Sequence, residues 1–382
     1  MIEKIEIYWG ADRDFESATE SLENAYFLTD VIAHINKTDI QISGIPSSQE
    51  KPMEVENLII HTDDYGGIKE WAVLGFSNNV LLHLKVNIKN IWLCNPPDKI
   101  YKDIIRTFEN AIIHEHKHEY KAITIEDMKR IAEGFNKAVI GQPHVIKQAL
   151  SSIYTLKSIK RKRPVTLLFL GDSGIGKTET AKYISECLGA NMVRIQFSMQ
   201  QTNSAYQYIF GAEHGEDSLA RELIRRSSNV ILLDEFDKVV PSFYNAFYQM
   251  FDEGVFVDSN YSVDVSQCII ICTTNYRTVE EAEKNLGTPI YSRFSKVVIF
   301  KPISIEDKLT IASNRYAEVI DNLDDEDKAL IESNGVLPFF EKAIREGSYH
   351  NMRMLRNDIE DAVNLEILKA KAHRCEYFSA EQ

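Results

Sequence analysis

The chain has 382 residues, of which 44% are hydrophobic and 26% are charged, a composition that suits a globular protein of two or three domains. Its formal net charge of −14 argues against a nucleic-acid partner, because a phosphate backbone would repel such a chain. No apolar run is long enough to cross a bilayer, the start carries no apolar signal-peptide core, and the five cysteines form no CxxC pair. We therefore expect a cytoplasmic protein with no membrane partner, no disulfide framework and no zinc site.

Residues 1–120 contain all three tryptophans and no motif with recognisable chemistry. Lys4–Trp9 alternates apolar and polar side chains, which predicts a strand. Helices are expected at residues 15–36 and 101–114. Between them, the apolar runs NLIIHT, EWAVLGF and NVLLHLKV are predicted to be strands, because Gly and Asn turns separate them. This pattern predicts a separate α+β domain.

The sequence HEHKH ends this region and places histidines at positions 114, 116 and 118. On an extended backbone, three such histidines could bind a metal ion. On the helix that we expect here, they would point in different directions and could not converge. We therefore predict a solvated linker at residues 115–123 rather than a metal site.

The pattern changes at Ile123. Thr124 and Asp127 have the spacing of a capping box, which predicts the start of a helix. Continuous apolar segments then alternate with helical ones, as is typical of a parallel sheet covered by helices on both faces. We therefore expect a doubly wound α/β domain at residues 121–301. The helical and polar remainder predicts a small helical domain at residues 302–382.

One basic run, KSIKRKR (Lys157–Arg163), stands out in this acidic chain. It could form a nucleic-acid patch. We favour a helix C-terminus, where cations offset the helix dipole and Pro164 ends the helix, because a nucleic-acid surface needs more than one short run.

GDSGIGKT (Gly171–Thr178) is the strongest chemical pattern in the sequence. It fits G-x-x-x-x-G-K-[ST] and lies between the strand-like VTLLFL and a helical segment, as a phosphate-binding loop requires. Glycines let backbone N–H groups surround phosphate oxygens, and the helix N-terminus adds positive potential. We expect Lys177 to reach the terminal phosphates of ATP and the Thr178 hydroxyl to ligate Mg²⁺.

Two carboxylates follow the apolar run NVILL. Asp234 would end a buried strand and belong to the magnesium shell, and Glu235 would act as the general base for a water molecule. An acidic pair after a strand is usually structural, but its position downstream of a phosphate-binding loop favours catalysis. A third buried strand, CIIICTTN, would deliver Asn275 to the same sheet edge. There it could orient the attacking water, although an asparagine capping a turn is the simpler interpretation of that residue alone.

Together these motifs make residues 123–374 resemble an AAA+ ATPase, and in particular the second ATPase module of Clp-type unfoldases and disaggregases. The resemblance rests on VIGQ, GDSGIGKTET, ILLDEFDKVVPSFYNAFYQMFDEG, TTN, IYSRFSKVVIFKPI and HNMRMLRNDI. It implies a P-loop α/β module with a small helical domain, the cofactors ATP and Mg²⁺, and a homo-oligomeric ring of hexameric size. The implied nucleotide contacts are Val139, Ile140, Gly171, Asp172, Ser173, Gly174, Ile175, Gly176, Lys177, Thr178 and Glu179.

The resemblance also assigns roles to residues near the sheet edge and beyond it. It implies that Asn275 is the sensor asparagine and that Arg293 is the arginine finger, which reaches the nucleotide of a neighbouring subunit. It implies that Arg353 is the second sensor arginine on the small domain. The surrounding sequence departs from the usual Gly-Ala-Arg there, and Arg356 is a nearby rival.

The segment NSAYQYIFGAEHGEDS (Asn203–Ser218) departs from the family. Clp-type modules carry here a loop with an aromatic residue between glycines, which grips a polypeptide in the ring channel. In this chain only Glu213, His214 and Gly215 remain between the matching flanks. Three aromatic residues lie just upstream, and a buried face is a simpler interpretation than a channel lining for them: Tyr206, Tyr208 and Phe210.

These features lead to one main hypothesis and two alternatives. We expect an ATP-hydrolysing ring that remodels, or is gated by, a dedicated protein partner recruited by residues 1–120, without general threading. The first alternative is an unfoldase or chaperone with an atypical pore loop. The second is an assembly scaffold controlled by ATP.

Overall fold

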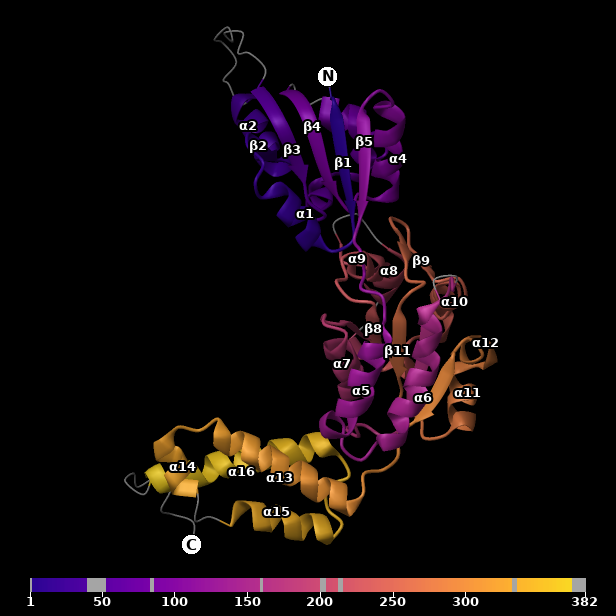
Figure 1. The fold of residues 1–382 in the computed structure, drawn as a ribbon. Helices are drawn as coiled ribbons and strands as arrows, with labels where there is room; N and C mark the ends of the chain where they lie inside the picture. The colour runs from indigo at the N-terminus through magenta and orange to yellow at the C-terminus, as the bar shows by residue number, and fades with distance from the viewer. Residues whose placement is uncertain are drawn as a thin grey trace.

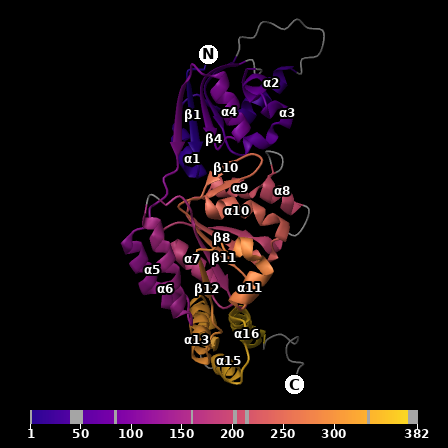
Figure 2. The same ribbon diagram turned by 90° about the vertical axis from the view of Figure 1, so that its right-hand side faces the viewer.

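The computed structural model describes residues 2–39, 53–82, 86–158, 161–199, 204–211, 216–331 and 335–372. Two α/β parts follow one another along the long dimension of the molecule, and a helical part lies beyond the second (Figures 1 and 2). Within the described ranges, no helix is long and apolar enough to cross a membrane.

The N-terminal part is built on a wholly parallel five-stranded sheet with the order β2-β3-β4-β1-β5. Its strands are β1 (Lys4–Trp9), β2 (Ala25–Phe27), β3 (Met53–Ile60), β4 (Val86–Cys94) and β5 (Ile112–Lys117). The segments between them form α1 (Asp12–Thr19), α2 (Leu28–Asp39), η1 (Asp64–Gly67), α3 (Glu70–Val73), η2 (Ser77–Leu81) and α4 (Asp98–Thr107).

The two faces of this sheet differ in their cover. Ile5 and Ile7 of β1 point to the face on which α2 and α4 pack, and both are fully buried. The opposite face carries Tyr8 and Trp92, whose rings stack with centroids 6.2 Å apart. α1 covers this second face through Phe15, which packs edge-on against Tyr8.

The N-terminal part has its own sheet, but this sheet is parallel and its order of elements is α/β rather than the expected α+β. EWAVLGF forms α3 and the turn that follows it, and the expected helix at 15–36 is interrupted by β2. Short apolar runs suit a buried helical turn as well as a strand, so periodicity alone could not separate them.

The histidine segment is also different from its prediction. α4 ends at Thr107, and the first four residues of HEHKH lie on β5 rather than on a helix, with His118 directly after the strand. Because alternate residues of a strand share a face, His114 and His116 both reach Glu6 of β1, at 3.0 and 2.6 Å. An irregular segment at 118–124 then leads into the next domain.

The central part contains the doubly wound parallel sheet that the sequence predicts, with the order β12-β6-β11-β8-β7. Its strands are β6 (Val165–Leu170), β7 (Val193–Gln196), β8 (Val230–Asp234), β11 (Ile269–Thr273) and β12 (Lys296–Ile299). An antiparallel hairpin, β9 (Val255–Val257) and β10 (Ser262–Asp264), projects toward the N-terminal part (Figure 1).

The helices of the central part cover both faces of this sheet. They are α5 (Ile125–Ala138), α6 (Pro143–Ile153), α7 (Lys177–Cys187), α8 (Ser204–Phe210), α9 (Leu219–Ile224), α10 (Asn245–Asp252), α11 (Val279–Leu286) and α12 (Thr288–Tyr291), with short turns η4 (Tyr154–Lys157), η5 (Phe197–Met199), η6 (Phe236–Lys238) and η7 (Pro241–Phe243). Leu167 and Phe169 of β6 belong to one apolar cluster, and Leu168 and Leu170 belong to the other. This explains why the strands read as continuous apolar runs. α5 begins with the predicted capping box of Thr124 and Asp127.

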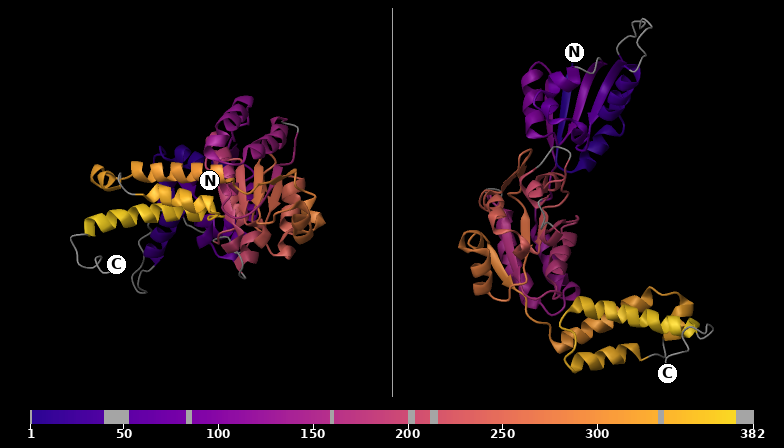
Figure 3. Two further views of the ribbon diagram at one scale, coloured as in Figure 1. Left: turned by 90° about the horizontal axis from the view of Figure 1, so that it is seen from below. Right: turned by 180° about the vertical axis from the view of Figure 1, so that it is seen from behind.

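The C-terminal part is helical, as predicted, and lies at the end of the central part away from the N-terminal sheet (Figure 3). It contains α13 (Ile305–Asp321), α14 (Asp325–Ile331), α15 (Val336–Arg345) and α16 (Met352–Ala372). Its core side chains continue the apolar cluster on one face of the central sheet. A movement of these helices would therefore change the packing against the central sheet.

Candidate functional site

A cavity of about 280 Å³ lies where the carboxyl ends of the central strands meet the C-terminal helices. This sheet edge is where ligands bind in doubly wound folds. The cavity brings together most of the predicted site residues: Val139, Ile140, Ser173, Gly174, Ile175, Gly176, Lys177, Thr178, Glu179, Asp234, Glu235, Asn275 and Arg353. Gly171 and Asp172 belong to the same loop but do not line the cavity.

The loop between β6 and α7 has a backbone that requires glycine. Gly171, Gly174 and Gly176 have φ angles of 135°, 78° and 105°, in the left-handed region that other residues rarely adopt. A Cβ atom on Gly174 would also collide with the side chain of Asn351. Gly176 stands directly before α7, so the loop delivers its N–H groups to a helix N-terminus, as phosphate binding requires.

The Lys177 ammonium is held inside this loop. Its Nζ donates to the carbonyl oxygens of Gly171 and Asp172, at 2.5 and 2.6 Å. Burial lowers the pKa of Lys177 to about 8, although the carboxylates of Asp234 and Asp237 act in the opposite direction. The hydrogen-bond partners of this buried ammonium are neutral carbonyl oxygens, so an anionic phosphate chain would give it a partner of opposite charge.

Asp234 is the centre of a polar network at the end of β8. Its Oδ1 accepts hydrogen bonds from Thr273 Oγ1 at 2.5 Å and Thr178 Oγ1 at 3.4 Å. Its Oδ2 pairs with Arg194 at 2.6 Å. The oxygens of Thr178 and Asp234 thus converge, and they are the hard ligands that Mg²⁺ prefers.

No group of three or more His, Cys, Asp or Glu side chains suited to a metal ion occurs in the described part of the chain. A magnesium ion held by one hydroxyl, one carboxylate, water and phosphate oxygens needs no such group. The residues present therefore fit a magnesium nucleotide.

Glu235 is positioned by an unusual backbone. Its φ of 55° lies in the left-handed region, which is uncommon for a residue with a side chain. Its N–H donates to Thr273 Oγ1 at 3.0 Å. This turn directs Glu235 into the cavity beside Asn275, away from the continuation of the strand. Strained backbone of this kind is frequent at active sites.

An apolar wall on the other side of the cavity suits a nucleobase. Val139 and Ile140 face Ile303, Ile311 and Met352, which come from the C-terminal part and its connection. Gln142 lies behind Val139 and Ile140 and is fully buried. Its side chain bonds both the N–H and the carbonyl of Lys301, which ties the two parts together.

Both candidate second-sensor arginines reach the cavity. Arg353 and Arg356 line it, and both are exposed on α16. The backbone N–H of Arg353 donates to Asn351 Oδ1 at 2.8 Å, so Asn351 caps the helix that carries them. The geometry of the single chain does not choose between the two arginines.

Arg293 lies outside the cavity of its own chain. Its Nε pairs with Asp252 at 2.7 Å, and its guanidinium is 4.3 Å from the ring of Tyr248. It lies just before β12 and near the amino end of β6, where its carbonyl accepts a hydrogen bond from Thr166, whereas the cavity lies at the carboxyl ends of the strands.

Sequence reasoning missed several polar residues around the site. Arg194 and Thr273 contact Asp234, Arg277 pairs with Asp172 at 2.6 Å, and Asn351 contacts the phosphate-binding loop. Arg194 and Thr273 stand at or near the ends of strands that flank β8. Polar residues at strand ends were therefore the available signal.

The aromatic residues before residues 212–215 have mixed surroundings. Tyr208 is buried on α8 and donates to Glu222 at 2.9 Å, as the simpler interpretation required. Tyr206 is 58% exposed, and its ring packs 4.7 Å from that of Phe210. The predicted loss of the pore-loop aromatic concerns Glu213, His214 and Gly215, which lie outside the described residues.

Comparison with known proteins agrees with this geometry. Residues 162–323 match the AAA domain family (Cdc48 subfamily). The chain is 34% identical over 200 residues to the chaperone protein ClpB of Helicobacter hepaticus, which covers 45% of this chain and 23% of that protein. It is 32% identical over 216 residues to ClpB of Staphylococcus aureus, covering 48% of this chain and 25% of that protein. The chain thus spans about a quarter of the length of these relatives.

Proposed function

The chain contains an AAA+ ATPase module of the Clp type, and we propose that this module hydrolyses ATP within a ring of identical subunits. We propose further that the cycle serves a dedicated protein partner bound by the N-terminal part, which the ring remodels or which gates the ring.

The observation that carries the proposed activity is the convergence of five side chains in one cavity: Lys177, Thr178, Asp234, Glu235 and Asn275. Bound Mg²⁺ would neutralise phosphate charge. Lys177 would bind the phosphate oxygens, and Thr178 and Asp234 would hold the metal shell. Glu235 would accept a proton from the attacking water, while the Asn275 amide would orient that water.

The proposed ring is supported by the position of Arg293. An arginine that stabilises phosphoryl transfer must approach the terminal phosphate. Arg293 does not line the cavity of its own chain. It lies just after α12, and its side chain is 26% exposed. It would act on the nucleotide of the adjacent subunit, so a single chain would lack a complete site.

The proposed partner is supported by exposed apolar side chains on the N-terminal part. Trp71 and Leu74 are each 65% exposed, and Leu82 is 58% exposed. These residues lie close together in sequence around α3 and η2. Exposed apolar side chains gathered in one region suit protein recognition better than solvent.

A threading unfoldase remains the second candidate because Tyr206 is exposed on α8, directly before residues 212–215. An aromatic residue at that position could contact a polypeptide even if the loop itself lacks one. The partner experiment below separates the two functions.

The ATPase assignment is tested with two variants of the full chain. Lys177→Ala should abolish nucleotide binding, and Glu235→Gln should retain ATP while its turnover falls about 10²-fold or more, as expected when a general base is lost. Glu283→Gln, an exposed carboxylate on α11, is the matched control and should hydrolyse ATP normally. Unchanged hydrolysis by both site variants would show that the cavity is not the active site.

The partner is tested by capture. Tagged Glu235→Gln protein is held in ATP in the native host, and the bound proteins are identified by mass spectrometry. We expect one near-stoichiometric protein that is lost when Trp71→Glu is added. A broad set of unrelated proteins, unaffected by Trp71→Glu but lost with Tyr206→Ala, would instead establish a general unfoldase.

A further inference from the structure

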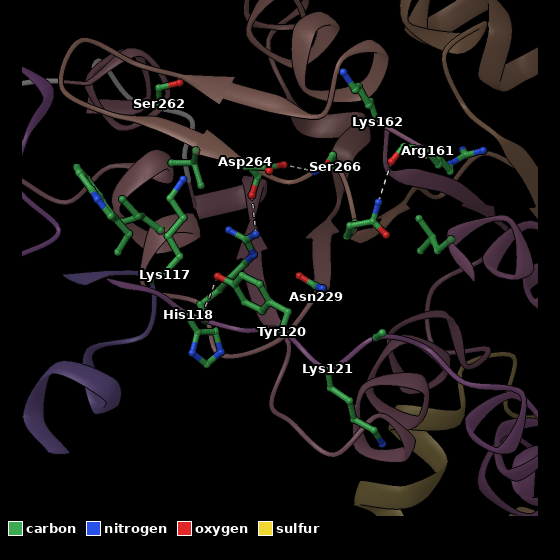
Figure 4. A pocket seen from close by; sticks show the side chains of 18 of the residues that line it. Lys117, His118, Tyr120, Lys121, Arg161, Lys162, Asn229, Ser262, Asp264 and Ser266 are labelled. Atoms are coloured by element: carbon green, nitrogen blue, oxygen red, sulfur yellow. Dashed lines mark hydrogen bonds between the residues drawn. The ribbon is translucent and has the colours of Figure 1, made fainter. Parts of the chain in front are cut away.

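A second and larger cavity, of about 790 Å³, lies at the junction between the N-terminal and central parts (Figure 4). Its walls come from the ends of β1 and β5, the connecting segment 118–123, hairpin strand β10, the end of η4 and the residues Arg161 and Lys162. Its volume is in the range of small-molecule sites, which often occur between domains. It shares no lining residue with the phosphate-binding cavity.

Basic side chains outnumber acidic ones in this junction cavity. Six lysines and arginines line it, against three carboxylates: Lys117, Lys121, Lys157, Arg161, Lys162 and Arg226 against Asp98, Glu115 and Asp264. The whole chain carries a net charge of −14, so this local excess of positive charge is unusual for the molecule. It would attract a small anion into the cavity.

Arg226 is the deepest of these cations. It is only 6% exposed, and its guanidinium lies 4.4 Å from the ring of Tyr120. Its two terminal nitrogens donate to the carbonyl oxygens of Leu223 and Asp264, at 2.7 and 2.6 Å. Its Nε is shielded from solvent and has no hydrogen-bond partner among the described residues. A buried guanidinium whose partners are neutral carbonyl oxygens carries a charge that an anion in the cavity would offset.

The neighbouring cations are also available to a ligand. The guanidinium of Arg161 donates to the carbonyl oxygens of Arg163 and Pro164, at 2.9 and 3.0 Å, and contacts no carboxylate among the residues that the structure describes. In the described part of the chain, Lys157 and Lys162 form no ion pair either. Lys121 is different, because Asp127 already neutralises it at 2.9 Å.

The N-terminal part supplies aromatic and acidic side chains to the lining of the junction cavity. The rings of Trp9 and Tyr101 pack edge to face, with centroids 5.4 Å apart. Trp9 Nε1 and Tyr101 Oη both donate to Glu115, at 3.2 and 2.7 Å, which fixes its carboxylate at the cavity. Aromatic rings stack on nucleobases, and carboxylates accept hydrogen bonds from exocyclic amino groups.

We propose that the junction cavity binds a nucleoside phosphate, at a site separate from the phosphate-binding loop. The phosphates contact Arg161, Lys162 and Arg226, and the base lies against Trp9 and Tyr101. Because both parts of the chain supply walls, the bound ligand links the N-terminal part to the ATPase module. Its occupancy then governs how firmly the two parts are joined.

Binding is measured on the full-length Lys177→Ala protein, in which the phosphate-binding loop is disabled. The probes are the four common ribonucleoside 5′-diphosphates, titrated by calorimetry. We expect saturable binding of at least one diphosphate. Arg161→Gln with Lys162→Gln should weaken it tenfold or more. Lys69→Gln with Lys284→Gln removes the same charge at two exposed sites outside the cavity and should leave the affinity within twofold.

Three results would overturn the proposal. The first is that no diphosphate binds saturably. The second is that the Arg161→Gln/Lys162→Gln variant binds the diphosphate with the same affinity as the Lys177→Ala protein alone. The third is that tripolyphosphate binds as tightly as the diphosphates, which would exclude a base subsite. If the Lys177→Ala protein does not fold, the number of diphosphates bound per chain is measured instead, on proteins with an intact Lys177. Two diphosphates per chain in the wild type and one in the Arg161→Gln/Lys162→Gln variant support the site, and equal stoichiometries refute it.

Discussion

At the scale of single residues, the Lys177 ammonium predicts a proton uptake linked to nucleotide binding. Burial holds its pKa at about 8, so a growing fraction of the free protein has neutral Lys177 as the pH rises above that value. Phosphate favours the charged form and raises the pKa again. ADP binding should therefore take up a fraction of a proton at pH 7.5 that approaches one near pH 9.

This uptake is measured by calorimetry in buffers of different ionisation enthalpy, at several pH values between 6.5 and 9. Lys177→Arg is the control, because a guanidinium stays charged throughout this range and should show no rise in uptake with pH. An uptake in the wild type that does not rise with pH would mean that Lys177 is fully charged in the free protein.

The residues of the site were predictable to the extent that their chemistry lies in a contiguous motif. Lys177 and Thr178 were identified from the loop, and Asp234 from its place after an apolar strand. Arg194 was not, because its pairing with Asp234 depends on β7 and β8 being neighbours, and one sequence does not give the strand order. Arg353 and Arg356 both line the cavity, because they lie three residues apart on the same helix.

At the scale of elements, Asn351 joins the phosphate-binding loop to α16. Its side chain caps α16 and lies against Gly174. Asn351→Ala should lower the free energy of unfolding by about 1 kcal/mol through the lost cap. It should also weaken ADP binding severalfold, because the loop loses a neighbour that holds its conformation. Chemical denaturation and calorimetry measure the two effects.

Thr278→Ala is the matched control for this prediction. Thr278 caps α11 by accepting a hydrogen bond from the N–H of Glu281, and it does not line the phosphate-binding cavity. Its loss should cost a similar amount of stability and leave ADP affinity unchanged. Equal ADP affinities in the two variants would mean that Asn351 acts only as a helix cap and does not support the phosphate-binding loop.

The elements themselves differ in how well the sequence predicts them. β6, β8 and β11 are buried on both faces, so their continuous apolar runs leave little choice of structure. The run that contains α3 is apolar for another reason, because Val73 and Phe76 pack into the N-terminal core from a short helical segment. A four-residue helix and a short strand bury side chains equally well, and only the surrounding sheet decides between them.

At the scale of the whole molecule, two arginines form ion pairs between the central part and the N-terminal part. Arg221 lies on α9, and Arg225 directly follows this helix. Arg225 pairs with Asp12 at 2.5 Å and with Asp63 at 3.1 Å, and Arg221 also contacts Asp63. Asp12 and Asp63 follow the carboxyl ends of β1 and β3. The contacts therefore connect the N-terminal part to α9, so a movement of α9 would reach the N-terminal part directly.

Arg225→Gln should loosen this junction. The amide of Asp98, which donates to the Asn260 carbonyl across the junction at 2.8 Å, should exchange its hydrogen severalfold faster. Arg106→Gln is the control, since it breaks an ion pair with Asp103 inside the N-terminal part. Unchanged exchange at Asp98 in the Arg225→Gln protein would show that other contacts hold the two parts together.

The proposed ring makes the last prediction, because Arg293 and Glu235 would complete one site only when they come from different chains. Each single variant, Arg293→Ala or Glu235→Gln, should lose most of the ATPase activity of the wild type. When the two variants are mixed in equal amounts, a chain with intact Glu235 can meet a neighbour with intact Arg293. Random assembly should then restore about a quarter of the wild-type rate, if the arginine acts between subunits.

Concentration and a second arginine provide the controls. The wild-type rate per chain should rise with protein concentration as rings assemble, and Arg345→Ala, an exposed residue of α15, should behave as the wild type does. A mixture that recovers no activity, together with a wild-type rate independent of concentration, would place the complete site in one chain. Arg293 would then have a structural role, through its contacts with Asp252, Tyr248 and the Pro289 carbonyl.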